Sequence, residues 1–268
     1  MINKAYVFNF HSGSFVDQLI ESGFSPYVIE WGDPGLVEAD MSINDYIQRL
    51  SQFTESLIHD AYKSPVILGY CMGGVLAGLY ASIAKDKIAG LALLATPWNS
   101  QSHQFTKFFD KFITNNRLIA KEFFQYGFYL PKFHAINSKY IEFGSAELIN
   151  ETWVEVESWV NDGVDMPKAI FEQFIREFSS NNYQNKAFHI GNLYYKMSDI
   201  SCPTLAIVAK YDSVALIDAT TAIKEMIDVD LVEISTGHVG LVVTNRQSTV
   251  ASMVAWCKKK NINKASIV

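Results

Sequence analysis

The most informative stretch of this 268-residue chain reads Val66-Ile67-Leu68-Gly69-Tyr70-Cys71-Met72-Gly73-Gly74. An apolar run typical of a buried strand leads into the pattern Gly-x-Cys-x-Gly, and a run with helical character follows. Glycines at this spacing predict a turn so tight that the strand and the helix approach each other closely. We expect Gly69 and Gly73 to leave room where a side chain would clash. The pattern therefore places Cys71 at the tip of a strand–turn–helix unit.

Short β-branched runs alternate with helical patterns on both sides of this turn, which is typical of a parallel sheet. The predicted strands cover residues 26–31, 65–70, 87–95, 204–211 and 230–235, and the predicted helices cover 43–61, 73–84 and 249–259. Residues 100–199 lack this alternation and contain more than half of the chain's Phe, Trp and Tyr. We therefore predict an α/β core of residues 1–99 and 200–268 and a largely helical cap of 100–199. The cap aromatics are expected to form their own core, and a second hypothesis is that some line an apolar tunnel.

A cysteine at such a turn has the chemistry of a nucleophile. The same strand–turn–helix unit carries the nucleophile of α/β-hydrolases, with cysteine here in the usual serine position. The helix that starts behind Cys71 favours a thiolate, because helix N-termini carry partial positive charge. The backbone N–H of Met72 is predicted to stabilise an oxyanion. The competing interpretation is a glycine-rich turn that holds an inert buried cysteine.

Candidate partners for this nucleophile follow in the order acid, then histidine, which the α/β-hydrolase fold requires. Asp212 comes directly after the predicted strand 204–211, and His238 lies in a Gly-His-Val-Gly loop after the strand 230–235. We expect His238 to take the Cys71 proton, while Asp212 orients the ring and stabilises its cation. Asp218 and Asp228 are weaker acid candidates, since both are expected on or beside a helix. The remaining histidines lack this context: His11, His59, His103, His134 and His189.

A cysteine nucleophile also favours a particular reaction. Exchange between a thiolate and a thioester is close to isoenergetic, so an acyl thioester would pass its acyl group readily to Cys71. The acyl-enzyme can then wait for a second nucleophile if water is excluded. This chemistry favours acyl transfer over simple hydrolysis.

Composition excludes several other classes of protein. The chain has 22 Lys and Arg against 28 Asp and Glu, a net charge of −6, which argues against nucleic acid as a partner. No apolar run reaches the roughly 18–20 residues that span a bilayer, and the N-terminal residues lack a secretory layout. Cys71, Cys202 and Cys257 are few and far apart, which predicts a reducing, cytoplasmic location without disulfides. We expect no metal and no cofactor.

The sequence also resembles the polyhydroxyalkanoate synthases, especially the short type that acts with a separate partner subunit. The blocks that carry this resemblance are Ile2-Asn3-Lys4-Ala5-Tyr6, Tyr27-Val28-Ile29-Glu30-Trp31-Gly32, Gly69 to Gly74, Trp159 to Pro167, and Gly237-His238-Val239-Gly240. The resemblance implies that Cys71, Asp212 and His238 polymerise (R)-3-hydroxyacyl-CoA into polyester on cytoplasmic granules, with release of CoA. The partners it implies are this substrate, the growing polyester or granule, a second synthase subunit and a second copy of the chain.

Two features depart from the family pattern. Leu216 stands where the family usually has a proline after the acid. In the family, the block that resembles Ile2-Asn3-Lys4 follows a central strand, so we expect the sheet to lack an inner strand. The residues alone allow 5–10 to be a strand, with 11–13 as an oxyanion loop. The resemblance instead makes 5–10 the approach to a helix, which we favour because it keeps the strand at Trp31 in register.

Two alternative functions remain open. The turn around Cys71 also looks like that of dienelactone hydrolases, which are compact cysteine hydrolases, and thioester hydrolysis belongs to the same class. The long insertion between Trp98 and Cys202 counts against a compact hydrolase. The third hypothesis is a truncated, non-catalytic synthase relative that binds granules or a synthase partner.

Overall fold

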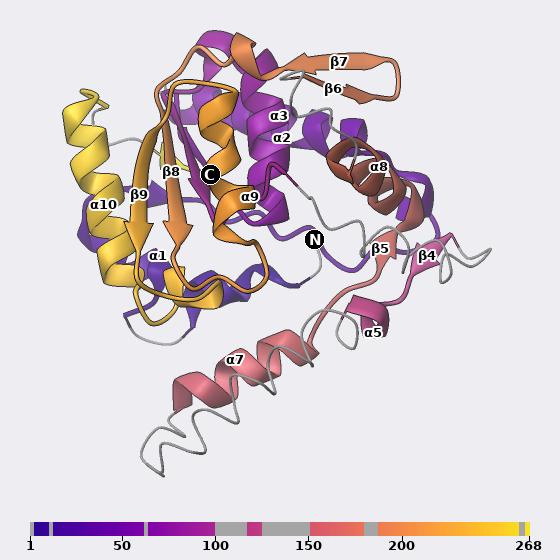
Figure 1. The fold of residues 1–268 in the computed structure, drawn as a ribbon, viewed down its shortest axis with the longest axis horizontal. Coiled ribbons are helices and arrows are strands. Elements are labelled where there is room, and N and C mark those ends of the chain that lie inside the picture. The colour runs from indigo at the N-terminus through magenta and orange to yellow at the C-terminus, as the bar shows by residue number, and fades with distance from the viewer. Residues whose placement is uncertain are drawn as a thin grey trace.

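A computed structural model describes residues 3–10, 13–61, 64–99, 117–124, 151–179, 187–262 and 266–268. Its centre is a six-stranded sheet in which every neighbouring pair of strands is parallel (Figure 1). The strands lie in the order β1 (Ser25–Pro26), β10 (Ser266–Ile267), β2 (Val66–Tyr70), β3 (Gly90–Leu94), β8 (Thr204–Ala209) and β9 (Asp230–Ile234). The strands predicted at 65–70, 87–95, 204–211 and 230–235 are thus confirmed. The strand predicted at 26–31 is reduced to Ser25–Pro26.

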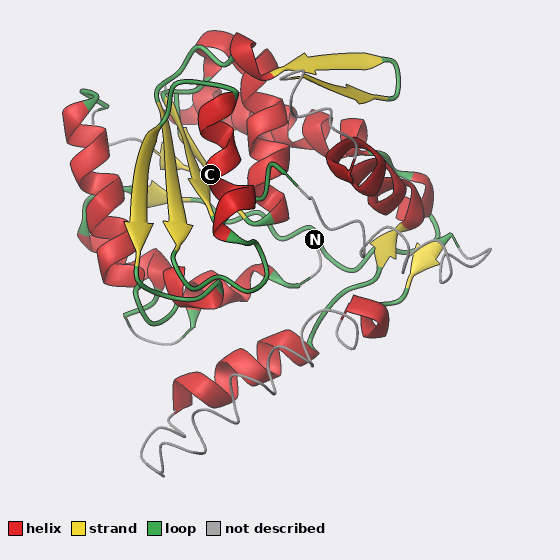
Figure 2. Ribbon diagram, in the orientation of Figure 1, coloured by secondary structure: helices red, strands yellow, loops and turns green. Residues whose placement is uncertain are grey.

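Helices cover both faces of this sheet (Figure 2). Successive side chains of β3 point to opposite faces of the sheet. Leu91 and Leu93 belong to the buried cluster on one face, and Ala92 and Leu94 belong to the cluster on the other. The first cluster contains residues of α2 (Ile43–Ala61), α3 (Met72–Ala84) and the short helix η8 (Ala222–Glu225), which follows α9 (Ile217–Thr221). The second contains residues of α1 (Phe15–Glu21) and α10 (Arg246–Lys259). A parallel sheet covered in this way explains why its strands read as continuous apolar runs.

The inner strand that we expected to be missing is supplied by residues from much later in the chain. β10 lies between β1 and β2 and pairs with both in parallel, with Ile267 opposite both Pro26 and Val66. The Val268 N–H donates to the Val66 carbonyl at 2.9 Å, and the Leu68 N–H donates to the Val268 carbonyl at 2.6 Å. β10 therefore corrects the expectation of a vacant inner position, although it pairs only with the first part of β2.

Residues 5–10 are not a strand. They form η1 (Ala5–Asn9), a 3₁₀ helix that leads to α1. Ser14 caps α1 reciprocally: its hydroxyl accepts from the Asp17 N–H at 3.0 Å, and the Asp17 carboxylate accepts from the Ser14 N–H at 3.0 Å. The approach to a helix that the family resemblance implied is therefore present. Residues 11 and 12 lie outside the described part of the chain.

The predicted cap contains helices and also antiparallel strands. Its described helices are α5 (Lys121–Phe124), α7 (Glu151–Asn161) and α8 (Lys168–Ser179), and its strands are β4 (Leu118–Ile119), β5 (Met166–Pro167), β6 (Ala187–Ile190) and β7 (Leu193–Lys196). β4 pairs with β5, and β6 pairs with β7 across a turn at Gly191. In Figure 1, α7 extends away from the sheet, whereas β6 and β7 project from the opposite side of the molecule. The division into core and cap stays a prediction.

Residues 3 and 4 form hydrogen bonds and an ion pair with the C-terminal end of α7 and the residue that follows it. The Trp159 indole N–H donates to the Lys4 carbonyl at 2.7 Å, and the Asn3 amide donates to the Trp159 carbonyl at 3.2 Å. The Lys4 ammonium pairs with the Asp162 carboxylate at 2.6 Å. The remaining short helices are η2 (Glu38–Asp40), η3 (Lys85–Lys87), η7 (Met197–Asp199) and η9 (Val239–Leu241). Within the described ranges, no helix combines the length and the apolar character that crossing a membrane requires.

Candidate active site

Cys71 occupies a strained turn between β2 and α3. Its backbone has φ 53° and ψ −124°, a region that side-chain-bearing residues rarely adopt and that costs about 1–3 kcal/mol. The turn is held in place because the Cys71 N–H donates to the Leu94 carbonyl at 2.8 Å and the Gly74 N–H donates to the Cys71 carbonyl at 3.0 Å. This geometry places the Cys71 side chain just beyond the C-terminal end of β2, at the start of α3, as the sequence motif predicts.

The glycines of the turn have different reasons to be there. A Cβ on Gly69 would lie 2.3 Å from the Gly74 Cα, which confirms that strand and helix need this glycine. A Cβ on Gly73 would meet no heavy atom within 4 Å, so the expectation that Gly73 relieves a clash is wrong. Gly74 has that role instead, because its Cβ would lie 1.8 Å from the Thr96 hydroxyl oxygen. The glycine that close packing requires on the helix side of the turn is therefore Gly74, one residue later than the sequence predicted.

The structure brings Asp212 and His238 together. The His238 Nδ1 lies 2.7 Å from the Asp212 Oδ2, and because a carboxylate only accepts, the ring donates through Nδ1. The other carboxylate oxygen accepts from the backbone N–H groups of Val214 and Ala215, both at 2.8 Å. The Asp212 side chain has no exposed surface and that of His238 is 6% exposed. A buried carboxylate with three donors is fixed in position, and so is the ring it holds.

His238 and Cys71 line the same cavity, and the charge of one affects the other. Removal from water by itself lowers the pKa of His238, because burial disfavours the cation. The Cys71 sulfur and the Asp212 carboxylate outweigh this effect and raise the pKa to about 10. The Tyr70 ring lies against the imidazole, with centroids 5.0 Å apart and planes at 34°. The contacts with Asp212 and Cys71 therefore favour the protonated form of the His238 ring.

The other two cysteines have a different environment. Burial raises the pKa of Cys202 and that of Cys257 to about 11 in each case. A thiol with such a pKa stays protonated near neutral pH and reacts slowly. Cys71 is partly exposed and stands at the first turn of a helix. Its position singles it out as the candidate nucleophile.

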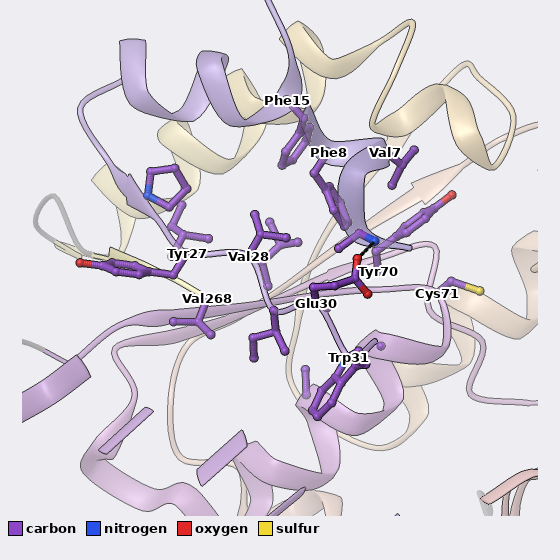
Figure 3. Close-up of a pocket in the computed structure, with 18 of the residues that line it drawn as sticks. Val7, Phe8, Phe15, Tyr27, Val28, Glu30, Trp31, Tyr70, Cys71 and Val268 are labelled. Carbon is purple, nitrogen blue, oxygen red and sulfur yellow. Dashed lines mark hydrogen bonds between the residues drawn. The ribbon is translucent and has the colours of Figure 1, made fainter. Parts of the chain in front are cut away.

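An apolar cavity of about 200 Å³ begins at Cys71 (Figure 3). Its walls come from η1, α1, β2, β10 and the segment that follows β1. Sequence reasoning missed two groups of its residues, namely Tyr70 on the elbow and Val7, Phe8 and Phe15 around η1 and α1. Tyr70 could have been suspected because it is the variable residue of the Gly-x-Cys-x-Gly motif. The position of η1 over the cavity depends on long-range packing and has no local signal.

The backbone N–H of Met72 is available for an oxyanion. Met72 is the first residue of α3, so no intrahelical acceptor exists for its N–H. Residues 11 and 12 of the suggested second oxyanion loop fall outside the described residues. The weaker acid candidates, Asp218 and Asp228, are exposed and do not line the cavity.

The other histidines that the structure describes do not contribute to the candidate active site. His59 and His189 are exposed and lie outside the cavity lining. His11, His103 and His134 are not among the described residues. No cluster of His, Cys, Asp or Glu suited to a metal ion occurs in the described part of the chain.

A parallel sheet, a strained strand-to-helix turn that carries a cysteine, and an acid–histidine pair later in the chain are the features of an α/β-hydrolase. The sequence profile of the α/β-hydrolase fold matches residues 61–243, and the chain belongs to this family. Solved structures agree on the fold: the Paleococcus ferrophilus monoacylglycerol lipase superposes with a TM-score of 0.58 at 16% identity, covering 92% of this chain and 88% of that one. An extracellular α/β-hydrolase from a Paenibacillus species superposes with a TM-score of 0.59 at 12% identity, covering 96% and 94%.

Curated relatives give a narrower resemblance. The chain is 27% identical to the poly(3-hydroxyalkanoate) polymerase subunit PhaC of Haloferax mediterranei, over 92% of this chain and 54% of the relative. It is also 27% identical to PhaC of Haloarcula marismortui (91% and 56%), and 24% identical to PhaC of Allochromatium vinosum (92% and 74%). The resemblance to polyhydroxyalkanoate synthases is confirmed. The chain spans about half the length of the two haloarchaeal relatives.

Proposed function

We propose that this chain is an acyltransferase that polymerises (R)-3-hydroxyacyl-CoA into a polyhydroxyalkanoate polyester through an acyl-Cys71 intermediate. The observation that carries the proposal is the buried Asp212–His238 pair beside Cys71, in a chain that resembles PhaC over 92% of its length. The strained elbow supports the same role, since strained backbone conformations cluster at active sites, where the strain positions a reactive group.

The first half-reaction transfers the acyl group to the enzyme. His238 holds the proton that leaves the Cys71 thiol, and the sulfur attacks the thioester carbonyl. The Met72 N–H donates to the oxygen that gains charge. The bond between the carbonyl carbon and the CoA sulfur then breaks, and the CoA thiolate takes the proton from His238. Asp212 holds the ring in the tautomer that this transfer needs.

The second half-reaction extends the chain. The 3-hydroxyl of another acyl unit loses its proton to His238 and attacks the carbonyl of the acyl-Cys71 thioester. An ester bond forms, the carbon–sulfur bond breaks, and the Cys71 sulfur recovers the proton. Thioester exchange is nearly isoenergetic, whereas ester formation from a thioester is downhill, so the sequence of steps favours polymer. The apolar cavity supports this order because it limits the access of water to the intermediate.

The proposal includes the setting of the reaction. The curated relatives are named as polymerase subunits, and we propose that this chain also works with a second synthase subunit or a second copy of itself. Its product would accumulate as polyester granules in the cytoplasm. The reaction needs no metal and no cofactor in this mechanism.

The test is to supply the purified chain with (R)-3-hydroxybutyryl-CoA and to measure both CoA release and the acyl product. We expect CoA release with insoluble polyester, and complete loss of turnover in the Cys71→Ala variant. Asp212→Asn should also lose most activity, whereas the matched control Asp218→Asn changes an exposed carboxylate and should not. CoA release with free hydroxy acid alone would instead identify a hydrolase. No CoA release, with or without a candidate partner subunit, would favour the non-catalytic alternative.

A further inference from the structure

Tyr70 contacts the candidate catalytic histidine but takes no part in the proton transfers. It is the last residue of β2, directly before Cys71. Successive side chains of a strand point to opposite faces of the sheet, so Tyr70 shares a face with Val66 and Leu68. The short helix η9, which directly follows His238, packs into the buried cluster on that same face. The strand register therefore directs the Tyr70 ring toward the loop that carries the histidine.

The hydrogen bond to Asp212 does not by itself define the plane of the His238 ring. The Asp212 carboxylate holds the Nδ1 edge of the ring at 2.7 Å. The second side-chain torsion of a histidine has a broad profile, so the ring can tilt while this hydrogen bond persists. Tilting moves Nε2 relative to Cys71, and Nε2 is the atom that must exchange protons with the sulfur. A contact on the face of the ring removes this freedom.

The Tyr70 ring makes such a contact. Its centroid lies 5.0 Å from that of the imidazole, and the two planes are inclined by 34°. Aromatic rings at such a separation attract each other, which stabilises the neutral imidazole in this place. A cation within about 6 Å of an aromatic ring is also attracted to the ring face, which stabilises the protonated imidazole. Because the His238 side chain is only 6% exposed, little water competes with this contact.

Tyr70 is itself held by aromatic neighbours. The Phe8 ring of η1 meets it edge-on, with centroids 5.9 Å apart and planes at 81°. Phe8 in turn packs against Phe15 of α1, with centroids 5.8 Å apart and planes at 60°. In Figure 3, Phe8 lies between Phe15 and Tyr70. The row of three rings thus connects α1 to the imidazole.

We propose that Tyr70 is a positioning residue of the acyl transfer, and that its ring keeps the His238 imidazole aimed at Cys71 while protons move on and off that imidazole. The inference rests on the proposed acyl transfer at Cys71 and adds the residue that orients its base. The aromatic ring of Tyr70 makes the contact, so phenylalanine should replace it. Leucine is apolar but has no flat ring, so it should not.

The first readout is the Nδ1 proton of His238 in the NMR spectrum. In the unmodified chain this proton should resonate far downfield, because a buried carboxylate accepts it, and the His238→Gln variant assigns the signal. We expect the signal to broaden by exchange with water in Tyr70→Leu and to persist in Tyr70→Phe. Tyr211→Leu is the matched control, since it also removes a tyrosine ring beside a triad residue. The Tyr211 ring is 65% exposed and lies outside the cavity lining, so the signal should persist.

The second readout is CoA release from (R)-3-hydroxybutyryl-CoA. Misplacement of a catalytic group by about 1 Å can cost about 100-fold in rate, so we expect kcat of Tyr70→Leu to fall about 10- to 100-fold. KM should stay within about twofold, because the ring acts on the transfer and not on substrate binding. Tyr70→Phe and Tyr211→Leu should keep the kcat of the unmodified chain. A rise in KM with an unchanged kcat would show that Tyr70 only contacts substrate and would overturn the proposal.

The two readouts separate this inference from the proposed function. If the unmodified chain releases no CoA, the acyl transfer is lost, and the Nδ1 proton alone decides whether Tyr70 holds the His238 ring. If the unmodified chain is active and a folded Tyr70→Leu chain keeps its kcat or its Nδ1 signal, the acyl transfer stands and the positioning role is overturned. Circular dichroism shows that each variant is folded. If Tyr70→Leu is not, Tyr70→Met, which also lacks a ring, decides by the same readouts.

Discussion

Exchanging Gly73 or Gly74 for alanine should change stability in opposite directions. In Gly73→Ala the new methyl group meets nothing within 4 Å, so only the gain in helix propensity remains, about 0.5–1 kcal/mol. In Gly74→Ala the methyl group lies 1.8 Å from the Thr96 Oγ1 and 2.8 Å from its Cβ and Cγ2. Thr96 is buried, and its hydroxyl donates to the Leu94 carbonyl at 3.3 Å, so it cannot turn away without loss.

The magnitudes decide the net effect. Overpacking of this kind costs about 1–3 kcal/mol, and contact at such short distances puts Gly74→Ala near 3 kcal/mol. The propensity gain offsets at most about 1 kcal/mol of this, which leaves a net loss of about 2 kcal/mol. Because Gly73→Ala gains rather than loses, the two variants should differ by roughly 3 kcal/mol in the free energy of unfolding.

Urea unfolding followed by circular dichroism measures this difference. A second substitution, Thr96→Ala, removes Oγ1 and Cγ2, so it should recover part of the Gly74→Ala loss, with a coupling of at least about 1 kcal/mol in the double-mutant cycle. Equal stability of Gly73→Ala and Gly74→Ala, or additive behaviour of Gly74→Ala with Thr96→Ala, would refute the packing argument.

Three further predictions concern the thiols, the imidazole and the acid loop. At pH 7, iodoacetamide should modify Cys71 and leave Cys202 and Cys257 unmodified in the folded chain, because burial raises the pKa of each of these two thiols to about 11. Peptide mapping measures the labelling of each cysteine, and equal labelling of all three would contradict this prediction. The pKa of His238 is raised from 6.5 to about 10, so protonation of this ring stabilises the folded chain. This contribution to the free energy of unfolding is complete below about pH 6.5 and is lost as the pH rises through 10. In Cys71→Ala, NMR titration should therefore give a lower pKa for His238, and an unchanged pKa would show that the sulfur has no part in it. Leu216 has φ −51° and is 59% exposed, so Leu216→Pro should raise the free energy of unfolding by about 0.4–1 kcal/mol, whereas a loss would show that the proline ring does not fit there.

The parts that sequence predicts well are those with a local signal. The run from Val66 to Gly74 contains the strand, the turn and the helix start within nine residues, and Asp212 and His238 follow recognisable strands. Which glycine relieves the clash depends instead on Thr96, which reaches the turn only through the pairing of β2 with β3. No local pattern contains that information.

Two other misses have different causes. The β6–β7 hairpin had a signal, since Gly191-Asn192 is a two-residue turn of the kind that joins antiparallel strands, and Gly191 has φ +60°. Ser266–Ile267 had none, because two residues are too short for any periodicity. Their place in the sheet is set by the gap between β1 and β2, which is a property of the assembled core.

The position of β10 also sets the order in which the molecule can be completed. It joins Ser25–Pro26 to Val66, yet the ribosome makes it more than 190 residues after the later of these two segments. Contacts between residues so distant in sequence form slowly, because a long loop must close before they stabilise anything. During synthesis, β2 therefore lacks its neighbour on this side until residues 266 and 267 have emerged. The turn at Cys71 does not depend on this late contact, because its backbone N–H donates to the Leu94 carbonyl of β3, so the nucleophile can be placed before the sheet is completed on this side.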